Sequence, residues 1–217
     1  MRHCDLVFCV DATGAMGSVW GSLPDDIPDA IEAARYRFEK AGYEPLSFRV
    51  RIVGFRDFRV DPEAIFESRF YQVPEEYEEL FAFTRGVWAH GGGDLPEDAF
   101  EGLAVALRSE FFCEEGDMRV VVLVSDGPPH PLGTHADCPG YPEDMPTSLD
   151  TLRAQVEGDP RLRLLLFAPL GWGEWQKTVD WENTFCTNID VGRCLEEVDF
   201  ADLLTAVLES LVPPARA

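Results

Sequence analysis

Acidic side chains stand directly after two strongly apolar segments, where they could bind a metal ion. One apolar run ends at Asp11, and a second runs into Asp126. A hydroxyl group, that of Thr13, follows Asp11 by two residues, and the glycine-rich stretch GGGDLPED contributes Asp94. Two carboxylates held close together repel each other unless one takes up a proton, and a divalent cation removes that conflict. Oxygen ligands of this type favour magnesium, calcium or manganese over zinc.

The same acids could instead accept hydrogen bonds from the nearby backbone. Asp11 and Asp126 could cap helices that follow, because a carboxylate accepts hydrogen bonds from the free N–H groups of a first helical turn. Asp94 could cap a helix that begins near Pro96, and it could be cap and ligand at once. The metal interpretation requires these side chains to converge in the fold.

The elements that must position them alternate along the chain. Leu6–Val10 and Val120–Val124 are continuously apolar, which is typical of central parallel strands covered on both faces. Apolar residues recur at spacings of three and four between residues 24 and 41, which predicts a helix. Further strands are expected at 47–55, 68–73 and 161–170, and further helices at 74–87, 96–111, 147–156 and 199–211. This order predicts one α/β domain, residues 1–217, with a mostly parallel sheet.

In such a sheet, ligands bind beyond the carboxyl ends of the strands, at the point where the strand order reverses. Acids that follow two adjacent strands would therefore face each other across that crevice. A long loop at 127–146, rich in proline, glycine and histidine, leaves the same edge. Loops of this length in a compact domain are usually functional or mobile.

Composition narrows the classes of partner. Forty acidic residues against 18 basic ones give a formal net charge of −22, which repels phosphate backbones and anionic membrane surfaces. We therefore expect neither a nucleic-acid nor a membrane partner, and no apolar run has the length of a membrane span. The N-terminal residues lack the pattern of a signal peptide, so a cytoplasmic location is expected. The oligomeric state is not predicted.

A second group of metal-binding residue types lies within the long loop. His130, His135 and Cys138 are close together in sequence. A zinc site there would need a fourth ligand, for which Cys186 and Cys194 are the distant candidates, and the spacing fits no standard zinc pattern. The alternative is that the cysteines are reduced thiols, the histidines are ordinary loop residues, and none of them binds a metal.

Three motifs in this order resemble those of the von Willebrand factor type A domain. DATGAM at 11–16 resembles the D-x-T-G-S-M run after the first strand of that family. GGGDLPEDAFEGLAVAL at 91–107 and VVLVSDGPPH at 121–130 resemble its second and third motifs. With RIVGFRDF at 51–58, they look most like the branch found beside alpha-kinase domains and in bacterial proteins. The resemblance implies a three-layer, doubly wound, Rossmann-like α/β fold with one antiparallel edge strand.

The resemblance also implies a metal-ion-dependent adhesion site. Carried over residue by residue, it makes Asp11, Thr13, Asp94 and Asp126 the metal ligands, with magnesium as the expected ion and calcium or manganese as alternatives. Ala15 replaces the last serine of the motif, so one hydroxyl ligand is missing. Three ionised acids around a divalent ion leave a net charge of about −1, which attracts an incoming carboxylate poorly.

The resemblance favours a non-enzymatic protein-binding module that acts as an adaptor or scaffold in a cytosolic multi-component system. Its partner would be a protein, such as a component of a kinase, protease or ATPase system. The alternative is a magnesium-dependent enzyme for phosphoryl transfer or hydrolysis that uses the same carboxylates. Against this alternative, Thr13 stands where a haloacid-dehalogenase-type phosphatase needs a second aspartate, and the chain has no Walker loop.

Overall fold

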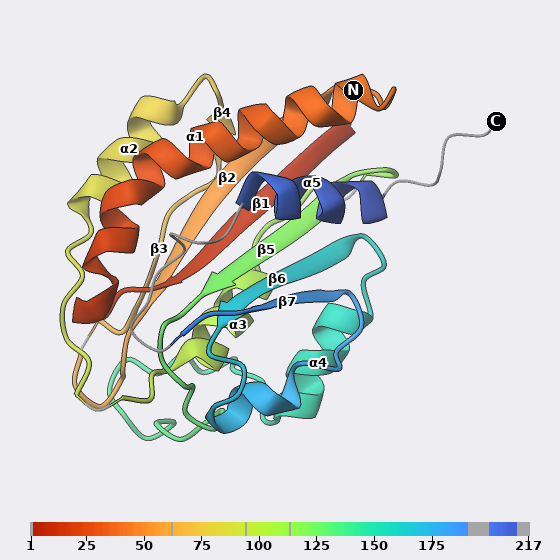
Figure 1. Cartoon of the computed structure of the whole chain (residues 1–217). Coiled ribbons are helices and arrows are strands. Elements are labelled where there is room, and N and C mark those ends of the chain that lie inside the picture. Colours follow the sequence, from red (N-terminus) through yellow and green to blue (C-terminus); the bar gives the residue numbers. More distant parts are fainter. Residues whose placement is uncertain (1, 62, 94, 113, 191–199, 212–217) are drawn as a thin grey trace.

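The computed structural model describes residues 2–61, 63–93, 95–112, 114–190 and 200–211, with backbone only for 200–203 (Figure 1). The strands are β1 (Arg2–Asp11), β2 (Leu46–Phe55), β3 (Ile65–Glu67), β4 (Tyr71–Val73), β5 (Met118–Val124), β6 (Leu162–Ala168) and β7 (Thr184–Asn188). The α-helices are α1 (Gly17–Lys40), α2 (Tyr77–Gly86), α3 (Ala99–Leu107), α4 (Leu149–Glu157) and α5 (Phe200–Ser210). Two short 3₁₀ helices are η1 (Gly14–Met16) and η2 (Gly173–Lys177).

The sheet has the strand order β3-β2-β1-β5-β6-β7, and β4 also pairs with β2. Strands β1, β2, β5, β6 and β7 run parallel to one another, whereas β3 and β4 run antiparallel to β2 at the edge. The predicted α/β class, with a mostly parallel sheet and antiparallel pairing at one edge, is confirmed. Short β3 lies before the edge strand expected at 68–73, whose last three residues form β4.

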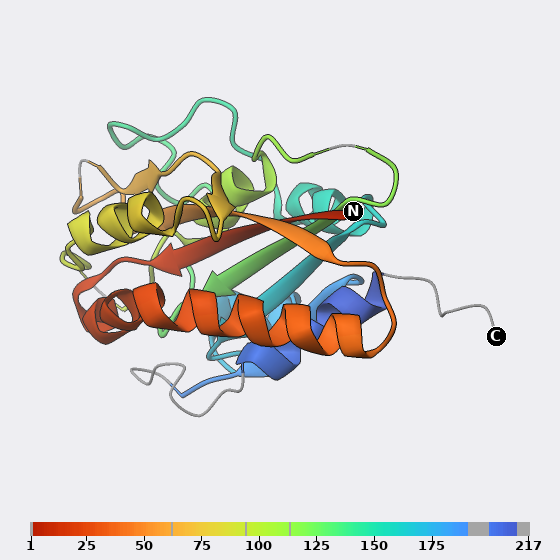
Figure 2. The same ribbon diagram turned by 90° about the horizontal axis from the view of Figure 1, so that it is seen from above.

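Helices cover both faces of the sheet and form two apolar cores. Figure 2 shows α1 and α5 on one side of the sheet and α3 and α4 on the other. Leu6, Phe8 and Val10 of β1 belong to the first core, whereas Val7 and Cys9 belong to the second. Because each face of β1 is buried against helices, the strand needs apolar residues at every position, which explains its unbroken apolar run.

Two helix boundaries differ from the prediction. Helix α1 begins at Gly17, not at Pro24, and Pro24 and Pro28 lie inside it. Val19, Trp20 and Leu23 extend the buried face toward the N-terminus, so tertiary packing outweighs the usual preference of proline for the first helical turn.

Helix α3 begins at Ala99 rather than near Pro96, and it ends at Leu107 rather than near Phe111. The preceding Glu97 is in a parallel bridge with Pro129, which holds the chain extended at that point. The inward-facing Phe200 and Leu203 predicted for α5 lie outside the described side chains, while Leu204 and Val207 are buried as expected.

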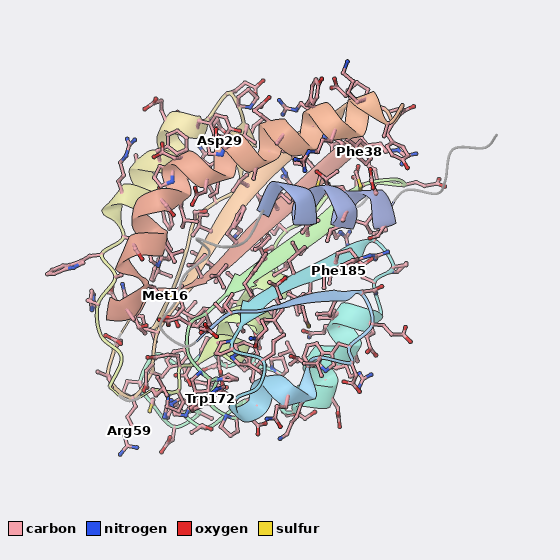
Figure 3. All side chains as sticks on the ribbon, viewed as in Figure 1. Met16, Asp29, Phe38, Arg59, Trp172 and Phe185 are labelled. Carbon is pink, nitrogen blue, oxygen red and sulfur yellow. The ribbon has the colours of Figure 1, made fainter. Side chains whose placement is uncertain are left out.

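The strand order reverses between β1 and β5, and this reversal defines the edge at which a ligand should bind. Val10 of β1 lies opposite Val124 of β5, so Asp11 is next to Ser125, and Asp126 follows. Figure 3 labels Met16, Arg59 and Trp172 toward this end of the molecule and Phe38 toward the opposite end. None of the described helices is both long and apolar enough to cross a membrane.

Candidate functional site

Asp11 is completely buried at the end of β1. Its Oδ1 atom accepts hydrogen bonds from the Thr13 amide at 2.9 Å and from the Thr13 hydroxyl at 2.7 Å. Its Oδ2 atom accepts a hydrogen bond from the Ser125 hydroxyl at 3.0 Å. The structure thus brings Asp11 and Thr13 together and adds Ser125, which the sequence analysis missed. Its position directly before Asp126, at the end of an apolar strand, is the signal that could have identified it.

The charges around Asp11 alter its protonation. Burial raises the pKa of Asp11 to about 6, the hydrogen bonds from Thr13 oppose that rise, and the negative charge of Asp126 adds to it. Burial also raises the pKa of Asp126, which is nearly inaccessible to solvent. A cation at this edge would reverse these shifts, because it stabilises the ionised carboxylates.

Glu97 is a further acid of this region that the sequence analysis did not select. It is 4% exposed, and its Oε2 atom is buried without a hydrogen-bond partner among the described residues. Burial is the main cause that raises the pKa of Glu97 to about 10, and the charge of Asp11 is the next. A carboxyl group with an unsatisfied buried oxygen beside another buried carboxylate is the kind of donor that a hard cation binds.

The glycine-rich loop approaches Thr13 and Glu97 closely. A Cβ atom at Gly92 would lie 2.7 Å from Glu97 Oε1 and 3.2 Å from Thr13 Cβ, and Gly92 has a φ of +77°. Only glycine fits both the space and this backbone conformation. Asp94, the fourth predicted ligand, follows this loop but lies outside the described residues.

Arrangement of the described oxygens limits how an ion could be held. Asp11, Glu97 and Asp126 are not among the groups of three side chains whose ligand atoms all lie within 4.8 Å, as far as the described residues go. The carboxylates of Asp11, Glu97 and Asp126 alone therefore do not enclose an ion, and the remaining positions would fall to other ligands such as the Thr13 hydroxyl and water. The predicted set is incomplete without Asp94.

A capping role does not account for these acids. The residues at the N-termini of η1, α1 and α3 are Thr13, Met16 and Asp98, and none of their side chains caps its helix. The carboxylate of Asp11 instead accepts the amide of the residue two positions on, as in an Asx turn. Asp126 is followed by the long loop rather than by a helix.

The protein supplies no arginine or lysine partner to this cluster in the part of the chain that is described. None of the described ion pairs involves Asp11, Glu97 or Asp126. Arg56 is buried nearby, but its guanidinium donates to the backbone carbonyls of Ala12, Glu63 and Trp88. Buried acids without a basic partner leave a place for an added cation.

Ala15, which replaces the serine of the resembling motif, is exposed in η1. A methyl group cannot act as an oxygen ligand, and its exposure leaves solvent access at this position. A water molecule could therefore take the place of the missing hydroxyl.

Comparisons with known proteins agree with this fold. No protein-family model matches the chain. An alpha-protein kinase of Dictyostelium discoideum, vwkA, is 27% identical over 145 residues, which are 67% of this chain and 22% of that protein. The chain thus spans about a fifth of the length of this curated relative.

Among solved structures, a von Willebrand factor type A protein from Catenulispora acidiphila matches with a TM-score of 0.53 and 15% identity, over 95% of this chain and 43% of that one. The PilB minor pilin of Streptococcus sanguinis matches with a TM-score of 0.50 and 9% identity, over 97% of this chain and 61% of that one. The chain has the fold of a von Willebrand factor type A domain, as its motifs predict.

Proposed function

We propose that the chain is a non-enzymatic protein-binding module with a divalent-metal site at the carboxyl edge of its sheet. Asp11, Thr13, Asp94 and Asp126 are the proposed ligands, and we add Glu97 to this set. When bound, the ion offsets most of the negative charge of the carboxylates and fixes their positions at the surface that meets the partner. We further propose magnesium as the ion, because it retains several waters and suits a site with few direct protein ligands.

The observation that carries this proposal is the burial of Asp11 beside Glu97 and Asp126 without a basic partner among the described residues. Burying an ionised carboxylate without compensation is costly, and proteins normally place a cation or a proton there. The metal-free protein uses protons, as the raised pKa values of Asp11 and Glu97 indicate. A divalent ion can replace those protons near neutral pH and is the occupant we propose.

Charge suggests which partner surfaces suit the module. With Asp11, Asp94 and Asp126 ionised around a divalent ion, the site keeps a net charge of about −1, and Glu97 adds to it when it loses its proton. The whole chain carries a formal charge of −22. Both features favour a basic or neutral partner over one that inserts a carboxylate, and we propose a protein with a basic surface.

We place the module in a cytosolic multi-component system, as an adaptor or scaffold. The relative with 27% identity is named an alpha-protein kinase, and the similarity involves 22% of its length. A kinase component is therefore one candidate partner, with protease and ATPase components as the other two.

Affinity capture tests this function. The wild-type protein, Asp11→Asn and the exposed-site control Asp26→Asn are immobilised and exposed to a lysate of the source organism, with magnesium or with a chelator. We expect the same specific protein to bind wild type and Asp26→Asn in magnesium only, and not to bind Asp11→Asn. Retention that is independent of both metal and Asp11 would contradict the proposal.

An assay with a generic aryl phosphate tests the non-enzymatic part of the proposal. We expect no magnesium-dependent turnover above background. Turnover that Asp11→Asn abolishes and Asp26→Asn preserves would establish the alternative, an enzyme that uses the same carboxylates.

A further inference from the structure

A second cluster of metal-ligating side chains lies outside the site described above. Asp57 follows β2, and His130 and His135 lie in the long loop, yet one potential ligand atom from each lies within 4.8 Å of the other two. The cluster is well shielded from solvent: Asp57 and His135 are buried, and the side chain of His130 is 12% exposed. Sequence reasoning grouped the two histidines with Cys138, but the fold adds Asp57 instead, a residue more than 70 positions away.

The distances between the potential ligand atoms of the cluster are similar to those between ligands that share one metal ion. His130 Nε2 lies 3.8 Å from Asp57 Oδ2, and His135 Nδ1 lies 3.4 Å from Asp57 Oδ1. A gap of 3.8 Å is too long for a direct hydrogen bond. Ligand atoms that surround a tetrahedral zinc ion at 2.0–2.1 Å are separated from one another by about 3.3 Å.

Two buried atoms of the cluster lie near each other without a hydrogen bond. Asp57 Oδ2 and His130 Nε2 are 3.8 Å apart, and neither has a hydrogen-bond partner among the described residues. Buried polar atoms are paired in the great majority of cases, so two unpaired atoms at this separation suit a ligand that both can contact.

Asp98 is a further carboxylate beside the cluster of Asp57, His130 and His135. Both of its carboxylate oxygens lie 3.0 Å from His135 Nδ1, and one of them accepts the Phe58 amide at 2.7 Å. Two aspartates and two neutral histidines carry a charge of −2, which a divalent ion would balance. The residue types are mixed nitrogen and oxygen donors, which suit first-row transition metals such as zinc and differ from the all-oxygen set at Asp11.

We propose that Asp57, His130 and His135 bind a transition-metal ion of the zinc type, with Asp98 as a fourth ligand. The ion fastens the 127–146 loop to the body of the domain. Between β5 and α4 this loop contains no helix or strand, and its first residues follow Asp126 directly. The metal therefore has a structural role: it holds one wall beside the carboxyl edge of the sheet.

Cobalt is a suitable probe, because tetrahedral Co²⁺ absorbs visible light much more strongly than hydrated Co²⁺. Chelator-treated protein is titrated with Co²⁺ and then with Zn²⁺, and the variants are His135→Gln, His130→Gln and, as the matched control, His90→Gln. His90 is half exposed and lies beside Asp61, outside the cluster. Circular dichroism checks that each variant is folded. We expect His130→Gln to disturb folding least, because His130 lies at the edge of the cluster.

We expect the wild type and His90→Gln to bind a single equivalent of Co²⁺ with strong absorption, and Zn²⁺ to displace it. The affinity of each cluster variant for Co²⁺ should fall by more than about 100-fold. This is the largest loss expected for a residue that only hydrogen-bonds to a metal ligand. Asp11→Asn should bind Co²⁺ as wild type does, because Asp11 is not part of the cluster. The cobalt result therefore does not depend on whether the magnesium site at Asp11 exists. Wild-type protein without strong absorption, or cluster variants that bind as tightly as His90→Gln, would overturn the proposal.

Discussion

At the scale of single residues, Asp11 shows how a strand can end on a buried acid. Its carboxylate is held by Thr13 and Ser125, both neutral, while burial and the negative charge of Asp126 raise its pKa. Neutral hydrogen bonds orient the carboxylate without neutralising its charge. The energetic cost of that charge therefore depends on what occupies the site, a proton or a metal ion.

Glu97 should make the stability of the metal-free protein depend on pH. Burial raises the pKa of Glu97 in the folded chain from its ordinary 4.5 to about 10, so the folded state holds more protons between these limits. Stability then falls as pH rises through this window, and the raised pKa of His135 acts in the same direction near neutrality. We expect the melting temperature in chelator to fall between about pH 6 and about pH 9, and to fall less in Glu97→Gln.

The exposed-site variant Glu39→Gln is the control and should retain the wild-type slope. Magnesium should raise the melting temperature of wild type more at the higher pH, because the ion competes with protons for the same carboxylates. A wild-type slope that Glu97→Gln leaves unchanged would show that Glu97 does not hold the extra proton.

Ala15 offers a gain-of-function test. Ala15→Ser restores the hydroxyl of the resembling motif at an exposed position where a side chain has room. A polar interaction with a net value of 0.5–1.5 kcal/mol corresponds to binding that is tighter by about 2- to 12-fold. Calorimetric titration with magnesium should show this gain in Ala15→Ser and no gain in Ala41→Ser, which lies at the far end of α1. Binding by Ala15→Ser that is no tighter than that of Ala41→Ser would contradict a place for residue 15 beside the ion.

The residue types at strand ends could be predicted, but their tertiary partners could not. Asp11 and Asp126 are visible in the sequence because each follows an unbroken apolar strand. Glu97 falls in the first turn of the helix expected at 96–111, where an acid is ordinary, and the bridge to Pro129 that holds it at the site arises from the fold. The nearness of Asp57 to His130 likewise arises from the fold, because 73 positions separate the two residues in the sequence.

At the scale of elements, α3 positions the acids because it lies very close to β2. A Cβ atom at Gly102 would lie 2.6 Å from Phe55 Cδ1 and 2.9 Å from its Cγ. Gly102→Ala should therefore push α3 outward and destabilise the protein by about 1–3 kcal/mol. It should also weaken magnesium binding, since Glu97 lies just before the helix.

Gly21→Ala is the matched control for this substitution. Gly21 lies in α1 with no atom within 4 Å of an added Cβ, so alanine should stabilise the helix by about 0.5–1 kcal/mol. Urea unfolding of both variants measures the two effects. Equal stabilities for Gly102→Ala and wild type would mean that the contact between α3 and β2 relaxes without cost.

Periodicity predicted the types of most elements but not all of their limits. The strands that are buried on both faces were predicted well, because β1 and β5 leave no polar position within their central residues. The start of α1 was wrong because Pro24 resembled a first-turn proline, while Val19 and Trp20 bury the earlier turns. The path of the 127–146 loop was beyond prediction, because it depends on side-chain contacts and not on any repeat.

At the scale of the whole molecule, a formal charge of −22 surrounds the site with a negative field. This field attracts divalent cations to the entire surface, so weak binding of magnesium by itself is poor evidence for a specific site. A specific site differs from this ion atmosphere in two ways: it saturates at a single equivalent, and it survives physiological salt, which screens exposed charges beyond about 8 Å. Experiments on the acidic edge need a control variant that has the same net charge.

Calorimetric titration of magnesium into wild type, Asp11→Asn and Asp26→Asn at physiological ionic strength tests the central claim most directly. The two variants carry the same net charge, but Asp26 is exposed on α1 whereas Asp11 is buried at the end of β1. We predict a single equivalent of bound magnesium for wild type and Asp26→Asn, and none for Asp11→Asn. Equal heats for all three proteins would contradict a metal site built on Asp11.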